Sequence, residues 1–169
     1  KFIIGTMDLL QTRASLKNAF RLEQTTMQPG ANNPLKFSAN VDDAIRNLLA
    51  GKSRQFAPTV ETVRDACQDL KIHEEAVTAG AKTAFDEFVD RLDPEELETR
   101  FDASLKRGSV FSTGKKGKYW DMYAELYKVM SERSSGQFPH TFSEDFARAY
   151  DEYRSAAKRS LSNSRRSGS

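Results

Sequence analysis

The sequence predicts an all-α protein, organised as a single domain of about six helices around one long central helix. Its composition is one reason, because 18 alanines and 13 leucines stand against only 11 valines and isoleucines together. Alanine and leucine favour helices, whereas strands are enriched in β-branched residues. Apolar side chains also recur at spacings of three and four along most of the chain. A chain of 169 residues is long enough to bury a substantial core without disulfides.

The first three helices are expected at residues 2–26, 41–50 and 59–92. An irregular stretch at 31–37 is expected between the first two, because Pro34 disfavours a helical residue before it. Asn40 is positioned to cap the second helix, and Gly51 follows its last turn. The long third helix carries an apolar stripe that we expect to face the core, and it consists of Val60, Val63, Cys67, Leu70, Val77, Ala81, Ala84, Phe85, Phe88 and Leu92.

The second half of the chain is expected to contain three further helices. Asp93 can cap the helix that Pro94 begins, with Glu96 completing a capping box. Residues 106–118 then hold three glycines and five positive charges, which indicates a basic loop. Helices are expected to follow at about 119–132 and from Ser143 onward, where Ser143 is a candidate cap.

Charge is distributed unevenly and marks the end of the ordered domain. Residues 1–153 carry 21 basic and 24 acidic side chains, whereas the residues after them carry five basic side chains and no acidic one. We therefore expect an ordered domain at 1–154 and a disordered, Ser- and Arg-rich tail at 155–169. A mildly acidic body argues against a broad nucleic-acid-binding face, so nucleic acid is not an expected partner.

No catalytic or metal-binding constellation is found, so we expect no enzyme activity, no cofactor, no metal and no small-molecule substrate. His73-Glu74-Glu75-Ala76-Val77 lacks the second histidine of the zinc-protease helix motif. The segment 108–116 has the wrong glycine spacing for a phosphate loop and follows a predicted helix instead of a strand. Cys67 is expected in the core. No apolar run approaches the roughly 20 residues that span a bilayer.

Two groups of residues are candidates for binding a protein partner. One is the segment Asn33, Pro34, Leu35, Lys36 and Phe37, and the other is the aromatic pair Trp120 and Tyr123. In the segment 33–37, Leu35 and Phe37 either form an exposed hot spot with Lys36 at its rim or anchor the loop to the helices beside it. The second interpretation is slightly favoured, because apolar anchors usually point inward.

The segment Asn32-Asn33-Pro34-Leu35-Lys36-Phe37-Ser38 also carries a family resemblance, together with motifs that follow it in order. It resembles the C-terminal domain of the forkhead-associated (FHA) domain protein of bacterial type VI secretion systems. The resemblance covers about residues 2–154, and the basic stretch 108–117 fits it poorly. The supporting motifs are Val60-Glu61-Thr62-Val63, Arg91-Leu92-Asp93-Pro94-Glu95-Glu96, Tyr119-Trp120-Asp121-Met122-Tyr123 and Phe142-Ser143-Glu144-Asp145-Phe146.

The resemblance implies a non-enzymatic scaffold or docking module. Its expected partners are a membrane-complex or baseplate component of the secretion apparatus and the FHA domain that precedes such domains in the same protein. That FHA domain is missing here, and the chain does not begin with Met, so we expect a piece of a longer protein. The expected location is the bacterial cytoplasm, with recruitment to the inner-membrane secretion complex as a further option.

An electrostatic function is the alternative. The basic loop and the tail could together bind nucleic acid or an anionic surface, and such binding weakens steeply with salt. The loop residues that would contribute are Lys106, Arg107, Lys115, Lys116 and Lys118.

Overall fold

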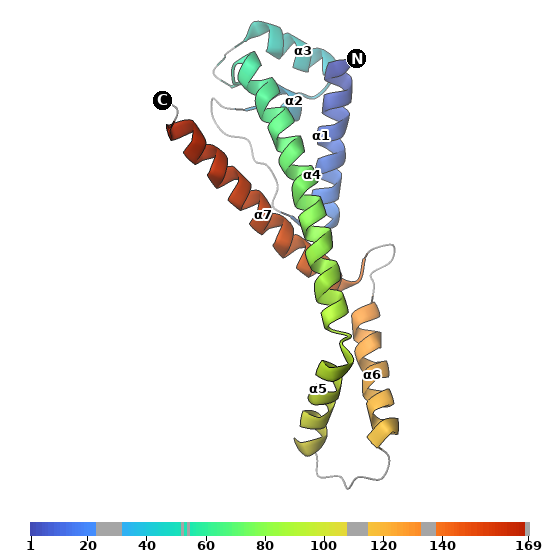
Figure 1. Cartoon of the computed structure of the whole chain (residues 1–169). Helices are drawn as coiled ribbons and strands as arrows, with labels where there is room; N and C mark the ends of the chain where they lie inside the picture. The colour runs from blue at the N-terminus through green and yellow to red at the C-terminus, as the bar shows by residue number, and fades with distance from the viewer. Residues whose placement is uncertain (23–31, 52, 54, 108–114, 133–137, 168–169) are drawn as a thin grey trace. The chain divides into compact units, whose positions relative to one another are not determined.

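The computed structural model describes residues 1–22, 32–51, 53, 55–107, 115–132 and 138–167, and these are all-α as predicted. Within them there is no strand, only an isolated bridge between Asn32 and Phe56. Seven helices are present in the described residues, one more than expected (Figure 1). They are α1 (Phe2–Ala19), α2 (Pro34–Phe37), α3 (Val41–Ala50), α4 (Thr59–Asp90), α5 (Pro94–Arg107), α6 (Lys115–Ser131) and α7 (His140–Ser167).

The chain divides into two compact units. Unit 1 comprises Lys1–Ala79 and Tyr150–Ser169, and unit 2 comprises Gly80–Ala149. The boundaries fall inside α4 and inside α7, so unit 2 is one continuous segment whereas unit 1 is built from two.

In unit 1, the core is a cluster to which four helices each contribute one buried residue. These are Leu10 of α1, Leu35 of α2, Leu48 of α3 and Ala66 of α4. Figure 1 shows α2 and α3 beside α1 and the first turns of α4. The predicted caps of α3 are confirmed, since the Asn40 side chain accepts a hydrogen bond from the Asp43 amide and Gly51 ends the helix with a φ of 72°.

In unit 2, α5 and α6 lie side by side, and Leu97 and Met130 are buried (Figure 1). The cap of α5 is confirmed, because the Asp93 carboxylate accepts hydrogen bonds from the amides of Glu95 and Glu96 at 2.9 and 3.0 Å. The Glu96 side chain does not complete the predicted capping box; it accepts a hydrogen bond from Arg100 at 2.6 Å.

The prediction that the large apolar side chains of α4 face the core is wrong in part. Val60 and Phe85 are 69% and 62% exposed, and Cys67 is exposed as well. Apart from Ile72, the residues buried in their place are small or polar. A Cβ placed on Gly80 would lie 3.0 Å from the Phe146 ring. Small side chains allow other elements to approach the helix closely. The buried residues of α4 are Thr62, Ala66, Asp69, Ile72, Ala76, Gly80 and Ala84.

Several predicted boundaries also differ from the structure. The first helix ends at Ala19, and the predicted residues 23–26 of that helix lie outside the described part. Residues 34–37 form one helical turn instead of irregular chain, because Pro34 occupies its first position. The tail predicted to be disordered is helical from residue 155 through Ser167. Its alanines favour the helix, and extending an existing helix avoids the cost of nucleation.

Candidate functional site

The segment 33–37 is held to α4 by the side chain of Asn33. Its carbonyl oxygen accepts a hydrogen bond from the Leu35 amide at 2.9 Å and so caps α2. Its amide nitrogen donates to the Thr62 carbonyl at 2.8 Å and to the Asp65 carboxylate at 2.9 Å. Asn33 is only 4% exposed, and its hydrogen bonds with Leu35 and Thr62 are buried, whereas the one to Asp65 is partly buried.

Lys36 forms the second connection to α4, through two carboxylates one helical turn apart. Its ammonium group lies 2.8 Å from an Asp65 oxygen and 2.5 Å from an Asp69 oxygen. The side chains of Lys36 and Asp69 are each 11% exposed, and Arg13 of α1 approaches the same Asp69 oxygen at 3.8 Å. Burial opposes the ionisation of Asp69, but the charge and hydrogen bond of Lys36 outweigh it and hold the pKa of Asp69 below its usual value.

The burial of this segment favours the anchoring interpretation over the exposed hot spot. Pro34 and Leu35 are almost completely buried, and Lys36 is engaged inside the protein. Sequence reasoning missed the charged partners Arg13, Asp65 and Asp69. A signal was available, because Asp65 and Asp69 are four residues apart and therefore share one face of a helix.

The aromatic pair lies on the surface of unit 2, at a cavity between α5 and α6. Trp120 is 69% exposed, and its ring centroid lies 5.5 Å from that of Tyr123. The cavity has a volume of about 600 Å³. Its rim is fixed by Tyr119, whose hydroxyl donates a 2.5 Å hydrogen bond to Asp102, and this bond raises the pKa of Tyr119 to about 12. The lining residues are Pro94, Leu97, Glu98, Phe101, Tyr119, Trp120 and Tyr123.

Comparison with known families decides what kind of domain this is. The family model described as the C-terminal domain of the type VI secretion system FHA protein matches residues 1–153. The chain belongs to this family. No curated protein and no solved structure is significantly similar to it.

In this type VI secretion FHA-protein domain, the five cationic residues of the predicted basic loop lie in helices. Lys106 and Arg107 end α5, and Lys115, Lys116 and Lys118 lie in the first turn of α6, so the loop prediction is wrong at these positions. Residues 108–114, which include most of the phosphate-loop candidate, lie outside the described part.

The described residues contain no group of three or more His, Cys, Asp or Glu side chains that could hold a metal ion. None of the described helices is both long and apolar enough to cross a membrane.

His73, the first residue of the incomplete zinc-protease motif, is half-buried in unit 1. Its Nδ1 lies 2.8 Å from the hydroxyl of Tyr150, a residue with no exposed surface. Burial, followed by the positive charges of Arg13 and Lys17, lowers the pKa of His73 from 6.5 to about 4.

This shift predicts a loss of stability on mild acidification. Between about pH 6.5 and pH 4, the unfolded chain binds a proton at His73 that the folded chain does not bind, so the free energy of unfolding falls as the pH falls. We expect the decrease between about pH 7 and pH 4.5 to be smaller in His73→Gln, which keeps a polar partner for Tyr150 without titrating. Urea unfolding across that range is the measurement, and equal decreases in the two proteins would contradict the assignment.

Proposed function

We propose that this domain is a non-enzymatic docking module of the type VI secretion apparatus, acting on its cytoplasmic side. It binds a membrane-complex or baseplate component through the aromatic surface of α5 and α6, defined as the residues that line the cavity between them. The single observation that carries the proposal is the exposure of Trp120 at the mouth of an apolar cavity.

The chemistry of this surface suits a protein partner. Trp and Tyr are the residues that most often dominate binding energy at interfaces, because each buries a large area at low entropic cost. An indole that is 69% exposed beside Tyr123 leaves apolar surface in water, which a partner would cover. The cavity of about 600 Å³ offers room for an apolar side chain of that partner to pack against Leu97 and Phe101.

The test measures binding to purified components of the membrane complex and the baseplate, each titrated separately against the 169-residue chain. Replacing both Trp120 and Tyr123 by Ala is expected to weaken binding to one component by at least about tenfold, because each truncation removes a central anchor. Phe85→Ala is the matched control, since Phe85 is 62% exposed in the same unit but does not line the cavity.

The control and the thermal midpoint together distinguish a loss of binding from a loss of folding. Phe85→Ala is expected to leave affinity unchanged, and the thermal midpoint of the double variant is expected to stay close to that of the parent. If every component bound the double variant and the parent equally well, this surface would not be the docking site.

Electrostatic binding to nucleic acid or an anionic surface stays as the alternative. The exposed side chains of Lys158 and Arg159 on α7 are available for it, but no observation on the described residues favours it over docking. Its signature in the same titrations is affinity for nucleic acid that falls steeply as salt is raised.

A further inference from the structure

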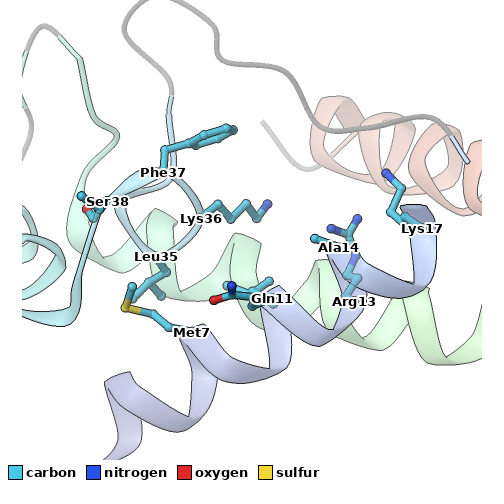
Figure 2. Close-up of a pocket in the computed structure, with 11 residues that line it drawn as sticks. Met7, Gln11, Arg13, Ala14, Lys17, Leu35, Lys36, Phe37 and Ser38 are labelled. Carbon is cyan, nitrogen blue, oxygen red and sulfur yellow. The ribbon is translucent and has the colours of Figure 1, made fainter. Parts of the chain in front are cut away.

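A second cavity lies in unit 1, between α1 and the segment 35–39, and its volume is about 420 Å³. That volume falls within the range of small-molecule sites in proteins. Its lining has two chemically distinct parts (Figure 2). Met7, Leu10 and Leu35 are apolar, whereas Arg13, Lys17 and Lys36 are cations.

The two parts are separated along the axis of α1. Met7 and Lys17 are ten residues apart on one helix, which corresponds to roughly 15 Å. Figure 2 shows Met7 and Leu35 near one end of the cavity and Arg13 and Lys17 near the other. The cavity therefore offers an apolar end and a cationic end to the same ligand.

Lys17 is the group that the fold leaves unsatisfied. It is 1% exposed, and its ammonium nitrogen has no hydrogen-bond partner within the described part of the chain. The Nε of Arg13, one helical turn earlier, is likewise buried without a partner there. Lys36 differs from both, because its ammonium is held by Asp65 and Asp69.

The surrounding charges do not compensate Lys17. Burial, followed by the positive charges of Arg154, Arg13 and Lys158, lowers the pKa of Lys17 to about 8, and only Asp151 acts in the opposite direction. The nearby carboxylate of Asp69 is already paired with Lys36. A buried ammonium without a partner is costly, and an anion bound beside it would remove that cost.

From this arrangement we propose that the cavity binds a small organic anion, a carboxylate or a phosphate ester, whose oxygens contact Lys17 and Arg13. The apolar portion of the ligand lies against Met7, Leu10 and Leu35. This site is in unit 1 and is separate from the aromatic surface of α5 and α6, so it goes beyond the proposed docking function, and its test does not depend on that function.

The test titrates the 169-residue chain with four probes: hexanoate, hexyl phosphate, inorganic phosphate and hexanol. Binding is followed by NMR at the Met7 methyl group and the α1 amides. Hexanoate or hexyl phosphate is expected to bind saturably and at least about tenfold more tightly than inorganic phosphate or hexanol, since only they match both ends of the cavity. Which of the two binds identifies the head group.

Lys17→Met removes the charge and keeps the apolar stem of the side chain, so it is expected to weaken binding at least about tenfold. Lys71→Met is the matched control on an exposed lysine of the same unit, with a side chain 75% exposed, and it is expected to bind like the parent. A second readout uses the parent chain alone: binding is expected to raise the pKa of Lys17 above about 8.

Three results would overturn the proposal. They are no saturable binding of either amphiphilic anion, binding that Lys17→Met leaves unchanged, and binding by the parent that leaves the pKa of Lys17 where it was. Equal affinity for inorganic phosphate and hexyl phosphate would show that the apolar end of the cavity contributes nothing to ligand binding.

Discussion

Lys36→Glu is expected to lower the free energy of unfolding by about 4 kcal/mol, the range found when one partner of a buried ion pair is lost. The substitution replaces the ammonium that bridges Asp65 and Asp69 with a third carboxylate. Three negative charges would then meet at a place where the side chains of Lys36 and Asp69 are nearly inaccessible to water. Urea unfolding, followed by circular dichroism, measures the change.

Arg46→Glu is the matched control for this charge reversal. Arg46 also forms an ion pair, with Asp43, but its side chain is 76% exposed, so the expected loss is below about 1 kcal/mol. If Lys36→Glu unfolded like the parent chain and lost only partner binding, the segment 33–37 would be an exposed hot spot after all. A large loss of stability supports the anchoring role.

Asn33→Ala carries the second large expected effect, a decrease of about 3 kcal/mol in the free energy of unfolding. The alanine removes the cap of α2 and leaves the buried Leu35 amide without its partner. It also removes the amide donor to the carbonyl of Thr62 and to Asp65. Unpaired buried polar groups account for most of this cost.

The chain contains its own control for the loss of a cap. Asn40 caps α3 with a similar hydrogen bond, of 2.8 Å to the Asp43 amide, but at an exposed position. Asn40→Ala is therefore expected to cost about 1 kcal/mol. Equal losses in the two variants would show that the contacts of Asn33 to α4 contribute nothing beyond capping.

The all-α class, the ends of α3 and the start of α5 could be predicted because they depend on local signals. The capping and turn residues act on backbone groups within a few positions of themselves, so the adjacent sequence is enough to predict these helix ends. These residues are Asn40, Gly51, Asp93 and Pro94. The helix after Tyr153 could not be predicted from the polar composition of the tail, because its alanines and its continuity with α7 favour the helix.

The buried face of α4 could not be predicted from hydrophobicity alone. Asp69 is buried because Lys36 and Arg13 neutralise it, and both lie more than 30 positions away in the sequence. Gly80 is buried because Phe146 approaches it. For the candidate sites, the sequence identified Trp120 and Tyr123 by residue type, but it gave no sign that Lys17 would be buried without a partner.

The order in which the two units are completed during synthesis follows from the way the chain passes between them. Tyr150, fully buried in unit 1, leaves the ribosome only after all of Gly80–Ala149 has been made. His73 must therefore wait for its hydrogen-bond partner while 76 intervening residues are translated. Unit 2 is a single uninterrupted segment, so all of its residues are synthesised before the last residues of unit 1. Unit 2 is therefore completed before unit 1 in the nascent chain.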